Sequence, residues 1–561
     1  MRLKLLRGAQ RAVRAIKPDL FQPDWATILH ESRDEWEQAR RAAERGPGVL
    51  VPTLIGGHVP STTMESLLAV ALTLRGARVE LVLCDETLPA CNRSHVTAVP
   101  SDAVFVKEGP QTNVCIQCYS AGAVTYRSLG LPFLTLGGLV SAEEVSAAAA
   151  LAADIAVEEI PVFMLDGMAI GEHALAGALR FYARGTLPEG PDAAGVLRRH
   201  LQAGLLTAYA TRRLFGQRHF EAAVFNHGIY VPQGIIGEAA RRSGVRVINW
   251  NPAYRAHCFI FSHGDTYHHT LMDEPTSEWE NLPWDAKRDA ELTTYLRSRW
   301  HGSQDWITFN ANPEESKAAI ERTLGIDFSK PTVGLLTNVM WDAQLHYRAN
   351  AFPSMLDWLL RTIEYFARRQ DLQLLIRVHP AEITGMVPSR QPIVDEIRSR
   401  FPTLPPNVFL IPPESPISTY VTMMQCNAVI IYGTKTGVEL TSEGVPVIAC
   451  GEAWIRNKGI TVDARSPEDY YRLLDELPGS GRLPEDTIAR ARRYAFHFFF
   501  RRMIPVQAVT PATGLVARQS KYQLAVKSLD DLRPGRDPGL DVICDGILEN
   551  RPFVYRAEEQ G

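Results

Sequence analysis

The feature that most constrains the fold is a pair of apolar runs separated by a polar turn, within residues 427–459. The first run covers 428–432 and the second covers 445–450, and neither alternates apolar with polar residues. Continuous apolar runs predict parallel strands that are covered on both faces, and ligands bind at the carboxyl ends of such strands. The turn at 433–437 follows the first run directly. We therefore expect a buried parallel sheet with a ligand site at this turn.

The side chains of the turn favour an anion. Thr434, Lys435 and Thr436 stand where the next helix is expected to begin, so that backbone N–H groups, two hydroxyls and one ammonium converge there. Glu439 follows one helical turn later, and a carboxylate beside a phosphate site suits hydroxyl donors such as those of a ribose. The sequence thus indicates a nucleotide phosphate with its ribose. The alternative is a helix cap with a solvated charge pair.

The same order of elements occurs twice in the first half of the chain. We expect a strand at 48–54, a Gly-Gly-His turn, a helix at 62–75 and a strand at 78–84, and then a strand at 222–225, a polar loop, a helix at 235–243 and a strand at 246–250. Strand, turn, helix and strand form the βαβ unit of a doubly wound domain. The polar loops should therefore open onto one crevice.

Several side chains follow these strands and are candidate contacts. Gly57 allows a close approach to the backbone, and His58 can serve as a base, as a donor to a phosphate or sugar hydroxyl, or as a helix cap. Asn226 and His227 lie on the second polar loop, and Glu238 lies one turn into the helix after it. The stretch 262–273, which we expect to be a polar loop, offers His263 and further polar side chains. Such a loop hydrogen-bonds a polar ligand or nothing, or, alternatively, binds a metal.

The βα pattern starts again in the second half. Expected strands at 332–336, 372–378, 408–411 and 428–432 deliver polar residues to one edge, as in a Rossmann-like domain. The sequence therefore predicts an α/β fold of two Rossmann-like domains. We divide it into a basic helical lead-in (1–47), an acceptor domain (48–278), a helical connection (279–305), a nucleotide-sugar domain (306–483) and a helical tail packing back on the body (484–561).

Composition excludes several classes of protein. Of the 561 residues, 45% are apolar and 22% are charged, with a formal net charge of -4, which is typical of a globular protein and gives no basic domain for nucleic acid. No run approaches the ~18 apolar residues of a spanning helix, and no secretory signal is evident, so we expect a cytoplasmic chain. Residues 1–17 form a basic amphipathic stretch, which either touches the inner face of the cytoplasmic membrane or packs on the body.

Four cysteines occur close together: Cys84, Cys91, Cys115 and Cys118. The last two form a Cys-x-x-Cys knuckle of the kind found in zinc ribbons, whereas the first two are spaced too widely for a second knuckle. A structural zinc is therefore one interpretation. Buried free thiols are the other.

Two motifs resemble those of the GT-B glycosyltransferases, which have two Rossmann-like domains facing a cleft. Glu439 is followed by Gly444 and Pro446 with the Glu-x4-Gly-x-Pro spacing of the donor half, where the family's glutamate holds the ribose hydroxyls. The turn Gly56-Gly57-His58-Val59-Pro60 is similar to the N-terminal glycine turn of the peptidoglycan N-acetylglucosaminyltransferase. This resemblance implies a GT-B-like fold.

A closer resemblance is to bacterial capsule and surface polysaccharide biosynthesis proteins, a group that includes Kdo transferases and is related in motif to sialyl- and polysialyltransferases. The matching stretches are 377–382, 413–420, 432–439 and 451–459. In that group a His-Pro element and a Ser/Thr turn contact the nucleotide phosphate, which implies contacts from His379 and 434–436. This chain has Thr-Lys-Thr where the Kdo and sialic-acid enzymes have a serine-rich turn, so a CMP-, UDP- or GDP-linked donor stays open.

The resemblance implies a glycosyltransferase that moves a sugar from a nucleotide sugar to a growing surface glycan, free or lipid-linked, without a required cofactor or metal. The expected nucleotide contacts are Arg377, His379, Glu382, Thr434, Lys435, Thr436, Glu439 and Lys458. The expected acceptor or sugar contacts are Gly57, Asn226, His227 and His263, and the candidate bases are His58, Glu238 and Asp342. The alternatives are a hydrolysing sugar-nucleotide epimerase of the same fold and a non-catalytic export or scaffold protein.

Overall fold

The chain divides into two compact units, neither of which is continuous in sequence. The computed structural model describes residues 21–110, 112–306, 312–343, 345, 349–385, 387–479 and 481–559. In these ranges the first unit consists of 21–182, 187–267 and 502–559, and the second unit consists of 183–186 and 268–501. The basic stretch 1–17 lies outside the described residues, so its membrane contact stays a prediction.

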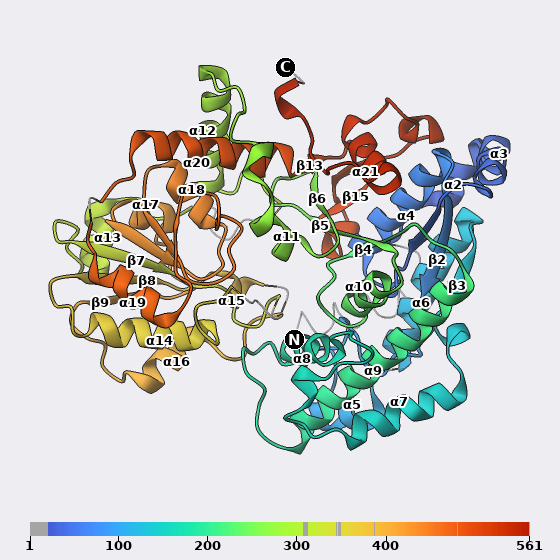
Figure 1. Cartoon of the computed structure of the whole chain (residues 1–561), viewed down its shortest axis with the longest axis horizontal. Coiled ribbons are helices and arrows are strands. Elements are labelled where there is room, and N and C mark those ends of the chain that lie inside the picture. The colour runs from blue at the N-terminus through green and yellow to red at the C-terminus, as the bar shows by residue number, and fades with distance from the viewer. Residues whose placement is uncertain are drawn as a thin grey trace. The chain divides into compact units, whose positions relative to one another are not determined.

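The first unit contains a doubly wound sheet (Figure 1). Its strands are β1 (Gly48–Val51), β2 (Arg78–Leu83), β3 (Phe133–Thr135), β4 (Ala222–Asn226), β5 (Arg246–Pro252), β6 (Cys258–His263) and β13 (Ile504–Pro505). Among the described residues their order is β13-β6-β5-β4-β1-β2-β3. Strands β1 to β5 are parallel, whereas β6 and β13 each add in the antiparallel direction. The strand order therefore reverses direction between β1 and β4, which is where such sheets bind ligands.

Helices cover both faces of this sheet. They are α2 (Trp25–Glu31), α3 (Arg33–Ala43), α4 (Val59–Leu74), α5 (Asp102–Glu108), α6 (Thr112–Leu129), α7 (Ala142–Asp154), α8 (Ile170–Tyr182), α9 (Pro191–Gln217), α10 (Gln233–Arg242) and α21 (Pro538–Glu549). Helices α4 and α6 pack on β2, and α10 packs on β4 and β5 beneath α9. Residues 61–73 of helix α4 are buried, because α3, α6 and α21 surround it.

The second unit repeats the design. Its strands are β7 (Thr332–Leu336), β8 (Gln373–Arg377), β9 (Val408–Ile411), β10 (Ala428–Ile431), β11 (Val447–Ala449) and β12 (Val462–Asp463). Within the described residues they form one parallel sheet in the order β12-β11-β10-β7-β8-β9. Strands β7, β8 and β10 are completely buried, as their unbroken apolar runs predict. The reversal of direction lies between β7 and β10.

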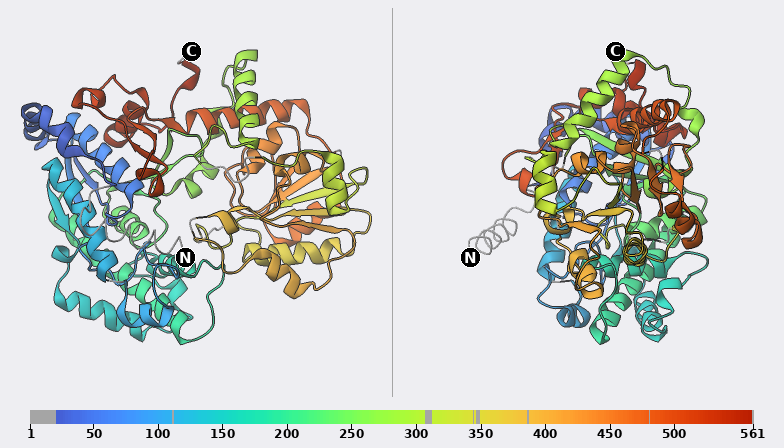
Figure 2. Two further views of the ribbon diagram at one scale, coloured as in Figure 1. Left: turned by 180° about the vertical axis from the view of Figure 1, so that it is seen from behind. Right: turned by 90° about the vertical axis from the view of Figure 1, so that its left-hand side faces the viewer.

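Helices also lie on both sides of the second sheet, as two views agree (Figures 1 and 2). They are α12 (Ala286–Trp300), α13 (Lys317–Leu324), α14 (Met355–Phe366), α15 (Ala381–Thr384), α16 (Ile393–Arg400), α17 (Thr419–Met424), α18 (Thr436–Ser442), α19 (Pro467–Asp475) and α20 (Glu485–Phe496), which continues into a π-helix at His497–Arg501. Helix α14 packs against β8 and α16, whereas α18 packs against β11 and α20. The predicted α/β class with two Rossmann-like domains is confirmed.

Two expectations about local structure were wrong. The stretch 262–273, expected to be a polar loop, is the end of β6 followed by helix α11 (Tyr267–Asp273). The tail is not mostly helical, because β13 joins the first sheet and β14 (Val509–Pro511) pairs with β15 (Tyr522–Leu524). Short strands of two or three residues carry too little periodicity to be recognised from sequence.

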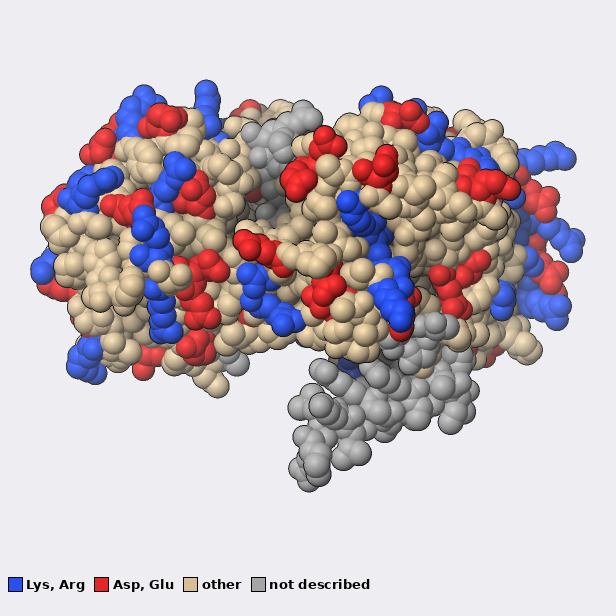
Figure 3. Space-filling view, turned by 90° about the horizontal axis from the view of Figure 1, so that it is seen from below, with Lys and Arg blue, Asp and Glu red and all other residues tan. Residues whose placement is uncertain are grey.

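On the face drawn in Figure 3, basic and acidic side chains of the described residues are interspersed. Among these residues, none of the helices has the combination of length and apolar character that a membrane-crossing span needs. Three consecutive aromatic side chains of the tail, Phe498, Phe499 and Phe500, are buried.

Candidate functional site

The loops that follow β7 and β10 are joined at the point where the second sheet reverses direction. Gly433 N–H, just after β10, donates to Asn338 Oδ1, just after β7, at 3.2 Å. His379, just after β8, donates its backbone N–H to Thr337 Oγ1 at 3.1 Å. Three adjacent strands thus place polar groups at one sheet edge, as the sequence predicted.

The tautomer of His379 is determined by its own helix. Nδ1 accepts the N–H of Ala381 at 3.0 Å, so Nε2 carries the ring proton and is the donor. Burial lowers the pKa of His379 to about 4, and the charges of Lys435 and Arg377 lower it further than Asp342 raises it. His379 is therefore a neutral hydrogen-bond donor at pH 7 that lies near Lys435 and Asp342.

The turn before α18 is built from hydroxyls and one ammonium. Thr434 Oγ1 and Thr436 Oγ1 lie 3.3 Å apart, and the Thr436 N–H points to Thr434 Oγ1 at 3.4 Å. Helix α18 begins at Thr436, contains only seven residues and has Lys435 as its N-cap. The charge at this turn therefore comes from the Lys435 side chain more than from the helix dipole, which a short helix makes weak.

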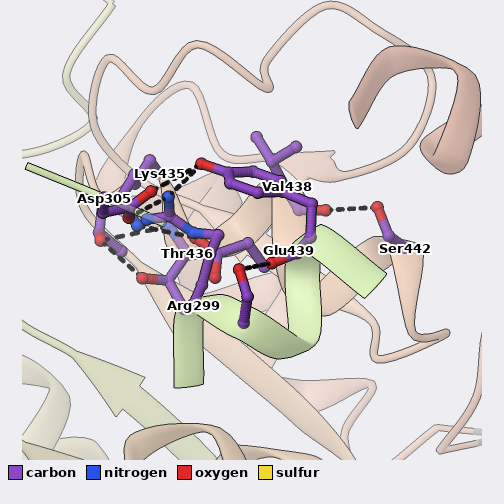
Figure 4. A network of polar contacts seen from close by, with 10 residues as sticks. Arg299, Asp305, Lys435, Thr436, Val438, Glu439 and Ser442 are labelled. Atoms are coloured by element: carbon purple, nitrogen blue, oxygen red, sulfur yellow. Dashed lines mark hydrogen bonds and ion pairs between the residues drawn. The ribbon is translucent and has the colours of Figure 1, made fainter. Parts of the chain in front are cut away.

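Lys435 belongs to a buried ionic network (Figure 4). Its Nζ lies 2.7 Å from Glu439 Oε1, and Arg299 Nε lies 3.2 Å from the same oxygen. Arg299 Nη1 pairs with Asp305 Oδ2 at 2.5 Å, and Tyr295 OH donates to Asp305 Oδ1 at 2.8 Å. Two cations and two carboxylates thus balance one another inside the second unit.

This network changes the interpretation of Glu439. Its side chain is only 3% exposed and its Oε1 is paired with two cations, so the ribose contact that the sequence motif suggested stays a prediction. Burial raises the pKa of Glu439, but Arg299 and Lys435 outweigh burial and hold the pKa below its usual range. Arg299 and Asp305 were missed because they stand at the end of a charge-rich stretch that was expected to be only a helical connection.

Three other expected nucleotide contacts have structural partners instead. Arg377 donates to the carbonyls of Pro412 at 2.5 Å and Ser415 at 3.2 Å, and so fixes the loop after β9. Glu382 is 1% exposed and accepts the N–H of Ile393, the first residue of α16. Burial raises the pKa of Glu382 to about 7. Both side chains shape the rim of the site rather than face a ligand.

Lys458 is the third expected nucleotide contact that has structural partners instead. Its Nζ donates to the carbonyls of Met272 at 3.0 Å and Glu274 at 2.6 Å, and the residue is 1% exposed. Burial lowers the pKa of Lys458 to about 8, because a buried ammonium loses its hydration. Lys458 therefore holds the segment after α11 in place and is not placed to bind a phosphate.

The first unit has an equivalent junction between β1 and β4. Glu65 on α4 accepts the backbone N–H of Asn226 at 3.0 Å and the indole N–H of Trp250 at 3.2 Å through Oε1, and the Thr53 hydroxyl through Oε2. It is 1% exposed, and burial raises its pKa to about 7. Glu65 was not predicted, because a carboxylate within an apolar helix has no motif to mark it.

Glu65 supports a strained loop. His227 follows Asn226 with φ +70, in the left-handed region that a non-glycine residue adopts mostly at turns and functional sites. The ring centroids of His227 and Tyr230 lie 5.0 Å apart, and the Arg180 guanidinium lies over the Tyr230 ring, 4.9 Å from its centroid. Burial and the charge of Arg180 lower the pKa of His227 to about 3.

His58 lies near the same group. Its Nδ1 is 2.7 Å from Ser61 Oγ, and Arg93 Nη1 donates to the neighbouring Gly57 carbonyl at 2.9 Å. Burial, with Arg93 and Arg180, lowers the pKa of His58 to about 3. The structure thus brings together His58, Asn226 and His227, and it adds two arginines that the sequence did not mark.

Other candidates in the first unit lie elsewhere or have structural roles. A Cβ on Gly56 would lie 2.8 Å from the Cα of Gly122, so the glycine turn allows α6 to approach rather than a ligand, and Gly57 likewise faces Cys118 at 3.1 Å. His263 is bonded to the Arg551 carbonyl at 2.8 Å and stacks on Phe553. These contacts argue against ligand roles for Gly57 and His263.

Glu238 is a poor candidate base. Its Oε2 accepts the N–H of Ala169 at 3.1 Å, and its Oε1 pairs with Arg241. Burial raises its pKa, but the hydrogen bond from His173 and the charge of Arg241 outweigh burial and lower the pKa to about 2. A carboxylate held in this way takes up a proton only weakly at pH 7.

The four clustered cysteines line one apolar pocket of the first unit together with Leu54 and Leu88. All four are free thiols. Burial raises the pKa values of Cys84 and Cys91. Among the described residues, no group of three His, Cys, Asp or Glu side chains is arranged to hold a metal ion. The four thiols are partly buried and line one pocket, and the zinc interpretation stays a prediction, as does a metal in 263–273.

The sheet edge formed by β7, β8 and β10 lies inside a recognisable segment. Residues 308–473 match the family of capsule polysaccharide biosynthesis proteins. The predicted resemblance is confirmed over this segment, which contains Asp342, His379 and the Thr434–Thr436 turn. Arg299 and Asp305 precede it. No curated protein matches the chain.

Among solved structures, the chain is similar to a Thermosulfurimonas dismutans KpsC described as a beta Kdo 2,4 transferase, with 12% identity over 49% of this chain and 79% of that one and a TM-score of 0.31. It is similar to a Streptomyces glycosyltransferase, SsfS6, complexed with thymidine diphosphate, with 10% identity over 80% and 94% and a TM-score of 0.22. It is also similar to the UDP-bound S. aureus MnaA, with 9% identity over 80% and 90% and a TM-score of 0.25.

Proposed function

We propose that this protein is a glycosyltransferase that moves a sugar from a nucleotide-sugar donor to a growing surface glycan. The observation that carries the proposal is that His379 and Lys435 follow β8 and β10, the two strands that flank β7, within the segment that matches capsule polysaccharide biosynthesis proteins. This is the edge where doubly wound sheets bind nucleotides. The nucleotide half of the donor would occupy the second unit.

The chemistry of this edge suits a departing phosphate. The Nε2–H of His379, the Lys435 ammonium and the hydroxyls of Thr434 and Thr436 are donors that would stabilise the negative charge left on the nucleotide when the sugar leaves. Asp342 lies near His379 and remains a candidate for contact with the sugar or for taking up a proton. Independence from a metal stays a prediction.

The acceptor would bind at the β1 and β4 ends of the first unit, where His58, Asn226 and His227 meet. A pKa of about 3 makes His58 a weak base in the ligand-free protein. A negatively charged substrate beside Arg93 and Arg180 would raise that pKa toward the range in which general bases work. The acceptor, free glycan or lipid-linked glycan, and a location at the inner face of the cytoplasmic membrane are parts of this proposal.

A thermal-shift screen of CMP, UDP, GDP and dTDP tests the nucleotide site. A nucleotide present at 100 times its dissociation constant should stabilise the protein by about 2.7 kcal/mol. Lys435→Met and His379→Asn should remove most of this shift, because each deletes a donor at the phosphate position. Lys330→Met, which changes an exposed lysine before β7, is the matched control.

Two results would contradict the proposal. If the folded wild-type protein binds none of the four nucleotides, the sheet edge is not a nucleotide site, as expected of a scaffold protein. If it binds one and releases free nucleotide from the nucleotide sugar at the same rate without any acceptor, it is a hydrolysing epimerase rather than a transferase.

A further inference from the structure

The structure shows that Glu439 Oε1 is shared by two cations of different origin. Lys435 comes from the β10–α18 turn, at 2.7 Å, and Arg299 comes from α12, at 3.2 Å. Glu439 and Arg299 have side chains 3% and 4% exposed, whereas that of Lys435 is 15% exposed. Lys435 is thus the more accessible of the two cations, and it lies near His379.

We propose that Arg299, held by Asp305, is a positioning residue that keeps Glu439 neutralised so that Lys435 can transfer its hydrogen bond to the phosphate of the nucleotide. This proposal rests on the nucleotide site described above. Without Arg299, moving Lys435 away would leave a buried carboxylate with no cation, which is among the least favourable changes inside a protein. Arg299 therefore makes the ammonium available.

The surroundings of Arg299 keep it in place. Asp305 Oδ2 pairs with Arg299 Nη1 at 2.5 Å, and Tyr295 OH accepts from Arg299 Nη1 at 2.8 Å. The guanidinium also lies over the ring of Phe499 at 5.0 Å. Because its guanidinium is held on several sides, Arg299 stays paired with Glu439 when Lys435 moves away. The flexible side chain of Lys435 allows its ammonium to make that movement.

The proposal gives Glu439 a different role from a ribose ligand, and the two roles have opposite consequences. If Glu439 held the ribose, Glu439→Gln would weaken ribonucleotide binding and a 2′-deoxy or 3′-deoxy nucleotide would bind less well than the ribonucleotide. If Glu439 instead restrains Lys435, Glu439→Gln should tighten binding, by about three- to ten-fold, since a charge-assisted bond no longer competes with the phosphate.

The decisive experiment is a double-mutant cycle on the full chain, with nucleotide affinity measured by calorimetry. Arg299→Met should weaken binding by about ten-fold or more, because Lys435 becomes the only cation of the described residues that is paired with Glu439. Arg299→Lys should restore part of the loss. Arg299→Met with Glu439→Gln should return the affinity to within about three-fold of wild type, because no buried carboxylate remains to retain Lys435.

Tyr295→Phe is the matched structural control. It removes the hydrogen bonds that the Tyr295 hydroxyl makes with Asp305 and Arg299 but leaves all four charges and the Arg299–Asp305 ion pair, so it should lower the melting temperature without the change in affinity seen for Arg299→Met. If the double variant binds as weakly as Arg299→Met, Arg299 serves only stability and the inference is wrong while the nucleotide site stands. If Arg299→Met does not fold, the nucleotide affinity of Glu439→Gln decides alone: tighter binding supports the inference, and weaker binding contradicts it. Absence of nucleotide binding in the wild-type protein would overturn both proposals.

Discussion

Glu65 allows a quantitative prediction, because one buried carboxyl group links α4, β1, β4 and β5. Its pKa rises from 4.5 to about 7 in the folded protein, mainly because burial disfavours the charged form. The native state therefore binds a proton that the unfolded chain has lost between about pH 4.5 and 7. Stability from this group is fully present below pH 4.5 and is lost as pH rises through 7.

The magnitude follows from the shift. A rise from 4.5 to about 7, at about 1.4 kcal/mol for each pH unit, corresponds to about 3 kcal/mol of unfolding free energy lost between pH 4.5 and 8. Glu65→Gln keeps an acceptor for Asn226 and Trp250 and removes the ionisation. The wild-type protein should thus lose about 3 kcal/mol more than Glu65→Gln over this range.

Urea unfolding followed by tryptophan fluorescence at closely spaced pH values measures the difference. Trp250 is fully buried and donates to Glu65, so its emission in the folded state should also titrate near pH 7 in wild type and not in the variant. Glu44→Gln, at an exposed position of the same unit, should follow wild type. Parallel pH profiles for wild type and Glu65→Gln would refute the reasoning.

Two further predictions concern His58 and Lys458. His58→Ala should lose about 10²-fold or more in turnover while retaining nucleotide binding, and full turnover would remove His58 from the role of base. Lys458→Met should lower the unfolding free energy at pH 7 by about 1–3 kcal/mol, because two carbonyls lose their donor. Since the pKa of Lys458 falls to about 8, the unfolded chain binds its proton more tightly between about pH 8 and 10.5. Wild-type stability should rise across that window, and the rise should be absent in the variant.

The sequence predicted the sheets well because buried parallel strands leave a strong signal. The runs at β7, β8 and β10 are apolar without interruption, and the residues that follow each of them, such as Asn338, His379 and Gly433, meet at one edge. The order of the strands, and the position at which this order reverses, could not be predicted, because they depend on pairing between strands that are far apart in the sequence.

Partners of charged residues were much harder to predict. Arg377, Glu382 and Lys458 stand within recognisable motifs, yet their side chains satisfy buried backbone groups. Conversely, Arg299 and Glu65 stand in helices without a motif, and tertiary packing brings them to the two sheet edges. A carboxylate or cation in sequence indicates chemistry, but only the fold decides whether water, backbone or a ligand satisfies it.

Strand β13 has a consequence for how the chain is made. Ile504 and Pro505 pair with β6, and Val506 donates its N–H to the carbonyl of His257 at 2.8 Å. During synthesis, all residues of the second unit leave the ribosome before this last strand of the first sheet does. Until then β6 is an open edge, and open edges are where strands of different molecules associate. A nascent or truncated chain that stops near residue 501 should therefore aggregate through β6, even though both doubly wound sheets are otherwise complete.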